Sequence, residues 1–175
     1  MKKLLYIILI VIALGAAALL WHWDKYESGY YHPQLSDIKD EVGQSNPYYV
    51  TSYPEDYKEL TQKEYDANIV FPVKKAVSAK LHCTGLFAAS HNLSANEMAK
   101  LLEILNDSAN YRWGELGTPE VHYYFTFHDS EDNSIGLTTI DREGQSYSQP
   151  SLARMKWGSL KRMDEVLALI KEIKD

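Results

Sequence analysis

Residues 121–140 read VHYYFTFHDSEDNSIGLTTI, and the spacing of apolar side chains in this stretch decides the fold. Up to residue 128 every second side chain is apolar, which is the pattern of a half-buried β-strand. A polar turn at residues 129–133 separates this strand from a second one at residues 135–140. Two such runs joined by a short polar turn predict an antiparallel β-hairpin.

Upstream of the hairpin the sequence predicts one strand and one helix. Apolar and polar residues alternate over residues 77–84, which predicts a strand with Cys83 on its apolar face. Ser94 and Glu97 have the spacing of a capping box, and the apolar residues that follow predict a helix over residues 95–106. Cys83 is the only cysteine, so an intramolecular disulfide is excluded and we expect this thiol to act as a small core residue.

Downstream of the hairpin the sequence predicts another strand and a final helix. Gly144 supplies a turn, and a strand is predicted within residues 145–157, where Pro150 favours an edge position. An apolar stripe predicts the last helix over residues 159–174. The order β-α-β-β-β-α indicates an α+β domain over residues 67–175, with an antiparallel sheet that carries both helices on one face.

The N-terminus carries an uncharged, apolar stretch of 18 residues, Leu4–Trp21, which follows two lysines. A helix of that length spans about 27 Å, close to the hydrocarbon thickness of a bilayer. Two tryptophans at its end fall where an interfacial aromatic belt lies. We therefore predict that residues 1–23 form a transmembrane signal-anchor helix, which contacts the lipid bilayer through residues 4–23.

The lysines before this helix predict its orientation. Positive charge stays on the cytoplasmic side, so we expect a single-pass protein of the inner or plasma membrane with its C-terminal domain outside. The alternative is a cleaved secretory signal, for which Ala16-Ala17-Ala18 offers a cleavage site. In that case the domain is secreted or periplasmic, and both alternatives take it out of the cytoplasm.

Residues 24–66 differ in character from the domain. They hold 10 acidic and four basic side chains and eight of the 13 tyrosines, within a chain of net charge −6. This composition predicts an acidic, tyrosine-rich tether with a short helix around residues 36–42. Its tyrosines either pack back onto the domain, which we favour, or form a docking strip. The acidic balance also argues against a nucleic-acid partner.

Histidines supply the weak candidates for a metal site. His82, His122 and His128 fall on the polar faces of two predicted strands, where two of the three could approach each other. Their spacing matches no known zinc pattern, and exposed strand histidines are much commoner than ligands. We therefore expect no cofactor, and we leave open whether these three histidines bind a metal.

A basic strip near the last helix supplies the candidate binding residues. It contains no acid and consists of Arg154, Lys156, Lys161 and Arg162. Such a strip could meet lipid headgroups, an anionic partner or the acidic tether, although solvated residues beside a helix are the commoner case.

Residues 93–140 resemble small uncharacterised exported or lipid-anchored bacterial proteins that are common in Bacteroidetes. The resemblance rests on the helix end at Leu101–Tyr111 and on the strand and amide-rich hairpin at Pro119–Ile140. Members of that group often carry cysteines after the helix and in the later strand, and this chain has none there. The resemblance implies an exported bacterial protein and no particular activity.

No catalytic, nucleotide-binding or metal-binding signature stands out in the chain, which favours a role without catalysis. The display outside a membrane suggests a binding or interaction module with a protein partner, such as an inhibitor, an immunity-type protein or an accessory subunit of an envelope complex. The alternative is an envelope hydrolase with an unrecognised site.

Overall fold

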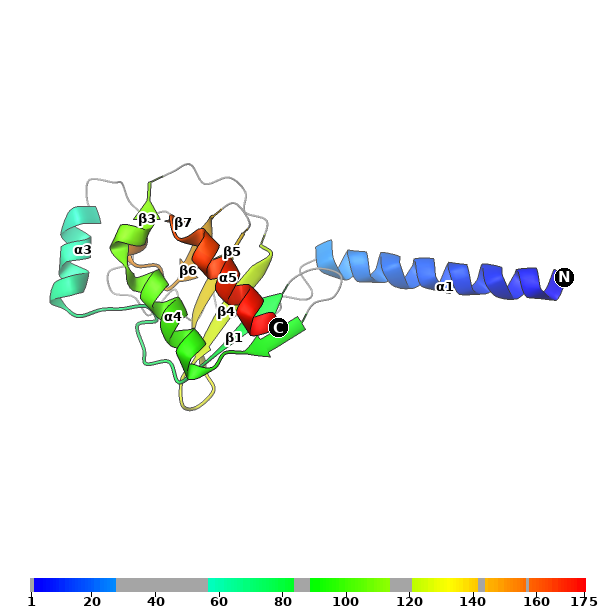
Figure 1. Ribbon diagram of the computed structural model, residues 1–175, viewed down its shortest axis with the longest axis horizontal. Coiled ribbons are helices and arrows are strands. Elements are labelled where there is room, and N and C mark those ends of the chain that lie inside the picture. The colour runs from blue at the N-terminus through cyan, green and yellow to red at the C-terminus, as the bar shows by residue number, and fades with distance from the viewer. Residues whose placement is uncertain (1, 28–56, 84–88, 114–120, 142–143, 157) are drawn as a thin grey trace.

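The hairpin predicted from residues 121–140 lies at the centre of an antiparallel sheet (Figure 1). Strand β4 (Tyr123–His128) pairs with β5 (Ser134–Ile140), and their register shifts by one residue beside His128. The hairpin is therefore confirmed. The structure is a computed structural model that describes residues 2–27, 57–83, 89–113, 121–141, 144–156 and 158–175.

Three more strands complete this sheet in the order β2-β1-β4-β5-β6, and every neighbouring pair is antiparallel. Strand β1 (Ser78–Cys83) was predicted from its alternation, and β6 (Ser146–Gln149) lies at one end of the sheet beside Pro150, as predicted. Strand β2 (Ala89–Asn92) was not predicted, because its four residues show no apolar alternation. The α+β class is confirmed. The described residues form more strands than the predicted order β-α-β-β-β-α contains.

Two short strands form a second sheet, in which β3 (Tyr111–Arg112) pairs with β7 (Ser159–Leu160). Each follows a 3₁₀ helix, η1 (Ser108–Asn110) and η2 (Ala153–Met155) respectively. The prediction that the last helix begins at residue 159 is therefore wrong. Residues 159 and 160 pair with β3, so the helix begins only after them.

The helices α4 (Ala95–Asn106) and α5 (Met163–Lys174) cover the same face of the large sheet (Figure 1). The capping box is present: the Glu97 N–H donates to the Ser94 hydroxyl at 3.3 Å, and the Glu97 carboxylate accepts from the Ser94 N–H at 2.6 Å. This arrangement satisfies two of the N–H groups that a helix start leaves unpaired.

The core lies between these helices and the sheet. Its fully buried apolar side chains come from every layer and include Leu81, Leu101, Leu105, Phe125, Phe127 and Val166. Cys83 is half-buried against this core, and burial raises the pKa of its thiol.

Helix α3 (Tyr57–Asp66) corrects the predicted tether of residues 24–66. It packs against η2, and its Glu64 side chain is fully buried, so the folded part of the chain begins within the predicted tether. Residues 28–56 of the predicted tether lie outside the described part of the chain. They include the helix predicted at residues 36–42.

Helix α1 (Lys2–Glu27) extends away from the sheet and the other helices (Figure 1). Its stretch Lys3–Trp21 is long and apolar enough to cross a membrane, and none of it is buried in the protein. A membrane anchor and a signal sequence both have these properties.

Two glycines with positive φ differ in what surrounds them, and they give a matched test of the fold. A Cβ on Gly158 (φ 83°) would lie 1.8 Å from the Ser146 carbonyl oxygen, whereas one on Gly144 (φ 91°) finds its nearest neighbour at 3.5 Å. Gly144→Ala should cost about 1–2 kcal/mol, from backbone strain alone. Gly158→Ala should cost about 3 kcal/mol or more, because the backbone must also move. Urea unfolding followed by circular dichroism measures both, and equal losses would contradict this packing.

Candidate functional site

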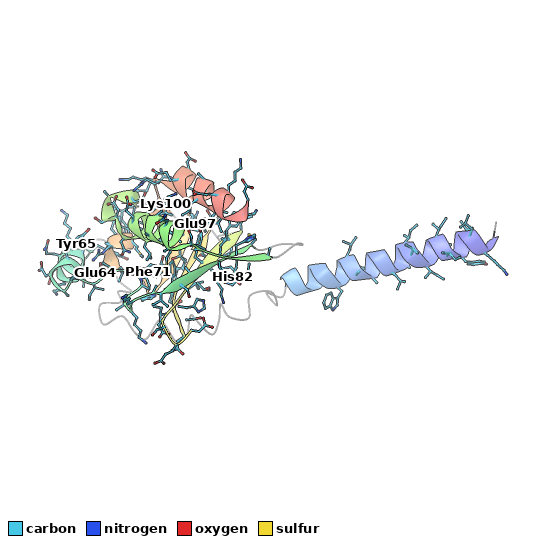
Figure 2. The ribbon with its side chains drawn as sticks, turned by 60° about the horizontal axis from the view of Figure 1, so that its bottom comes forward. Glu64, Tyr65, Phe71, His82, Glu97 and Lys100 are labelled. Atoms are coloured by element: carbon cyan, nitrogen blue, oxygen red, sulfur yellow. The ribbon has the colours of Figure 1, made fainter. Side chains whose placement is uncertain are left out.

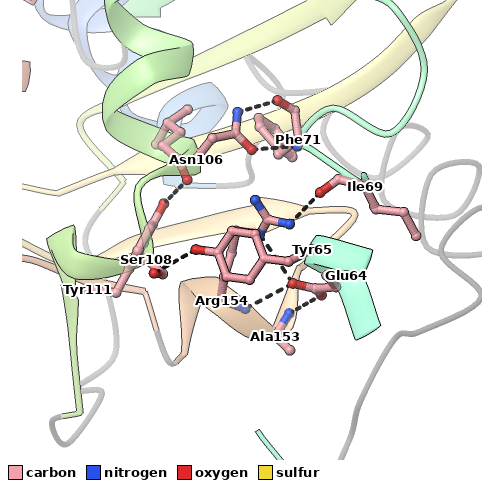
Figure 3. Close-up of polar contacts among 10 residues, drawn as sticks. Glu64, Tyr65, Ile69, Phe71, Asn106, Ser108, Tyr111, Ala153 and Arg154 are labelled. Atoms are coloured by element: carbon pink, nitrogen blue, oxygen red, sulfur yellow. Dashed lines mark hydrogen bonds and ion pairs between the residues drawn. The ribbon is translucent and has the colours of Figure 1, made fainter. Parts of the chain in front are cut away.

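A buried carboxylate fixes α3 to the rest of the domain. Glu64 is fully buried, and its carboxylate accepts hydrogen bonds from the backbone N–H groups of Ala153 (2.5 Å) and Arg154 (3.2 Å) at the start of η2 (Figure 3). The Arg154 side chain adds an ion pair, with Nε 3.3 Å from the same carboxylate. The two residues are 90 positions apart in the sequence, so this contact joins the first and last parts of the domain.

The Arg154 guanidinium is enclosed on several sides. It is 4% exposed, donates to the Ile69 carbonyl through Nη2 and lies 4.4 Å from the centre of the Tyr65 ring. The Tyr65 hydroxyl in turn donates to the Ser108 hydroxyl at 2.8 Å. Buried charge is costly unless it is paired, and these contacts supply that pairing.

The chain after α3 is held by a separate contact. Asn106, the last residue of α4, accepts from the Phe71 N–H and donates to the Phe71 carbonyl, both at 2.7 Å (Figure 3). The side-chain amide thus satisfies both backbone groups of one residue, and it positions the segment between α3 and β1.

A cleft of about 520 Å³ opens where α3 meets η1, η2 and the end of β3. Its described lining combines aromatic, basic and uncharged polar side chains with no acid: Tyr57, Lys58, Thr61, Gln62, Tyr65, Ser108, Trp113, Ala153, Arg154 and Lys156. Tyr57 and Trp113 make an edge-to-face pair with ring centres 4.6 Å apart. Tyr65 and Trp113 remain 47% and 39% exposed, so rings with large apolar faces are open to solvent here.

The structure divides the predicted basic strip. Arg154 and Lys156 line the cleft, whereas Lys161 and Arg162 are not among its lining residues. Lys161 donates to the Ala109 carbonyl at 2.8 Å, and Arg162 forms an ion pair with Glu165 at 2.6 Å. The strip also pairs with the acidic tether at one point, because Arg154 forms its ion pair with Glu64, which belongs to the predicted tether.

Lys156 has an unusual backbone and a constrained ammonium group. Its φ of 51° is positive, and Nζ donates to the Tyr111 carbonyl at 2.5 Å. Burial lowers the pKa of this lysine, and the charge of Lys161 acts in the same direction. Lys156 also borders a smaller hollow of about 160 Å³ beside β6. Residues with a strained backbone often lie at functional sites, so the positive φ of Lys156 supports a functional role for the cleft that it lines.

The three candidate histidines do not form a metal site within the described residues, where no group of three or more potential ligands gathers. His82 and His128 do approach each other, because Nε2 of each lies 3.0 Å from the Thr126 hydroxyl. His122 precedes β4 instead of lying within it, and its backbone N–H donates to the Ile140 carbonyl at 3.3 Å. Figure 2 shows His82 well away from Glu64 and Tyr65 of α3.

Sequence reasoning missed the α3 wall of the cleft. Tyr57, Glu64 and Tyr65 were assigned to the tether because Pro33, Pro47 and Pro54 and the repeated tyrosines mask any period there. Residues 57–66 are nevertheless free of proline and glycine, which was the available signal for a helix.

No protein-family model matches this chain, and no curated protein or solved structure shows significant similarity to it. The site must therefore be interpreted from its own geometry.

Removing one member of the buried pair of Glu64 and Arg154 should detach α3 from η2 and destabilise the domain. Glu64→Gln and Arg154→Met should each lower the free energy of unfolding by about 3–5 kcal/mol, because each leaves the other buried group without its partner. The double variant should lose less than the two single losses together. Urea unfolding of the full chain in detergent micelles measures all three.

Glu59→Gln is the matched control, since it removes an exposed ion pair with Lys63 on the same helix. That change should leave the free energy of unfolding nearly unchanged, because solvent screens an exposed pair. A loss for Glu64→Gln as small as that of the control would show that the buried pair does not hold α3.

Proposed function

We propose that this chain is a membrane-anchored binding module, which displays its domain outside the cytoplasm and binds an acidic segment of a protein partner in the cleft beside α3. The observation that carries the proposal is the lining of the cleft, where exposed aromatic rings lie next to basic groups and no described residue is acidic. A segment with negative charge complements such a surface.

The residue types in the cleft favour a protein partner. Tyrosine, tryptophan and arginine are the side chains that most often dominate the energy of protein interfaces. Tyr57 and Trp113 pack against each other, so these rings lose little conformational freedom on binding, and the buried Arg154 fixes the wall of the cleft beside them. The volume of about 520 Å³ accommodates a few side chains of a partner.

The placement outside the cytoplasm is supported by the N-terminal helix. The span of 19 residues, Lys3–Trp21, begins with one lysine and follows another, Lys2, and positive flanks stay in the cytoplasm. Retention of this helix makes the chain a single-pass anchor, and cleavage near Ala16–Ala18 would release the domain. The resemblance to exported bacterial proteins agrees with either outcome.

Capture of the partner should depend on the cleft. In a pull-down from native membranes with the full chain, Trp113→Ala and Lys58→Glu should each reduce recovery of the partner about tenfold or more. Trp113→Ala removes an aromatic wall, and Lys58→Glu places repulsive charge against an acidic segment. Quantitative mass spectrometry of the eluate measures the recovery.

Lys171→Glu on α5 is the control, because it makes the same charge change at an exposed position away from the cleft. It should leave recovery unchanged, and raised salt should release the partner from the wild-type chain. The proposal is wrong if no stoichiometric partner is recovered, or if the cleft variants recover as much of it as the control.

The orientation gives a separate prediction. Protease added to intact spheroplasts should digest the domain, because the domain lies outside the cytoplasmic membrane. Immunoblotting with an antibody against the C-terminal helix follows the loss of the domain. Resistance of residues 57–175 until the membrane is lysed would contradict this topology.

A further inference from the structure

A chain of polar side chains crosses three strands on the sheet face opposite α4 and α5. The Ser90 hydroxyl lies 2.9 Å from Nδ1 of His82, whose Nε2 lies 3.0 Å from the Thr126 hydroxyl. The Thr126 hydroxyl is also 3.0 Å from Nε2 of His128, and Nδ1 of His128 faces the Asp132 carbonyl oxygen at 3.4 Å.

The Asp132 carboxylate also faces His128, with Oδ1 3.5 Å from Nδ1. When both imidazoles are neutral, these contacts set the direction of every hydrogen bond in this chain. A carbonyl oxygen can only accept, so Nδ1 of His128 carries the proton and its Nε2 accepts from the Thr126 hydroxyl. The Thr126 oxygen then accepts from Nε2–H of His82. Nδ1 of His82 is therefore unprotonated, and it accepts the hydrogen bond of the Ser90 hydroxyl. A serine whose proton points at the unprotonated nitrogen of an oriented imidazole is the arrangement of an activated nucleophile.

The two ends of this chain of hydrogen bonds differ in their exposure to solvent. Ser90 on β2 pairs with His82 on β1, which pairs with Tyr124 on β4. Ser90 is exposed, whereas Thr126 and His128 are buried, so the nucleophile faces solvent and its support lies inside. The Tyr124 ring stacks on the His82 ring with centres 4.4 Å apart and planes 4° apart, which restricts the orientation of the imidazole.

The backbone of β2 supplies a hydrogen-bond donor near Ser90. The Leu93 N–H donates to the Ala79 carbonyl at 2.9 Å, and antiparallel pairing alternates between bonded and non-bonded pairs. The pair of Ser90 and His82, three positions along the same register, is therefore non-bonded. The Ser90 N–H points away from β1, toward the outer edge that β2 forms among the described strands.

We propose that Ser90 and His82 form a nucleophile and general base that hydrolyse carboxylic esters at this edge of the sheet. Ser90 Oγ attacks the ester carbonyl carbon while Nδ1 of His82 takes the hydroxyl proton. The Ser90 N–H donates to the oxyanion of the tetrahedral intermediate. The alcohol leaves with the proton from His82, and water then attacks the acyl-serine with the same histidine as base, which releases the carboxylic acid.

Thr126 and His128 are positioning residues in this arrangement. The Thr126 hydroxyl accepts from Nε2–H of His82, and His128 orients that hydroxyl by accepting its hydrogen bond. Replacement of the Thr126 hydroxyl by a methyl group keeps the shape of the side chain but frees the His82 ring to change tautomer. This activity is separate from the proposed binding function, because none of these residues lines the cleft beside α3.

A fluorophosphonate probe tests the nucleophile directly, because it phosphonylates activated serines. The full chain in detergent micelles should be labelled at Ser90, as located by peptide mass spectrometry, and should hydrolyse p-nitrophenyl butyrate. Ser90→Ala and His82→Ala should both abolish labelling. Ser78→Ala, which removes a serine from β1 on the same face, is the control and should label like the wild type.

Variants of Thr126 distinguish a positioning role of its hydroxyl from a general effect on folding. Thr126→Val should slow labelling at least about tenfold and shift its pH profile, whereas Thr126→Ser, which keeps the hydroxyl, should restore both. Circular dichroism spectra identify variants that fail to fold. Absence of Ser90 labelling in the folded wild-type chain, or equal labelling of Thr126→Val and Thr126→Ser, would overturn the proposal.

Discussion

The ion pair between Glu64 and Arg154 is the contact on which the arrangement of the domain depends. It joins α3, which precedes every strand, to η2, which precedes the last helix. Because the carboxylate also accepts from two backbone N–H groups, its desolvation is compensated by hydrogen bonds as well as by charge. Without this contact α3 would have no buried polar attachment to η2, and the cleft would lose one wall.

The sequence was most informative where a local pattern determines structure. The alternation over residues 121–140 located β4 and β5, and Ser94 with Glu97 located the start of α4. Strand β2 was missed because four residues with a histidine and an asparagine lack a period, and they become a strand only by pairing with β1. The start of α5 was misplaced because β7 forms by pairing with β3, which lies far upstream in the sequence.

The candidate sites were harder to predict, because both depend on contacts between distant parts of the chain. Arg154 and Lys156 were identified as candidates from their charge, but the aromatic residues beside them come from α3 and from the end of β3. Two of the three histidines His82, His122 and His128 were expected to approach each other, while Ser90 and Thr126 carried no signal. The register of β1 against β2 and β4 is what brings those four side chains together.

The position of α3 along the chain has a mechanical consequence. It is the first described element after α1, so tension applied to the chain at α1 would reach α3 before any described strand of the sheet. The layers of the core are joined by many apolar contacts, whereas α3 is fastened chiefly at one buried pair. Tension would therefore detach the wall of the cleft while the sheet and its two covering helices stayed folded, and the shape of the cleft would depend on the force transmitted through α1.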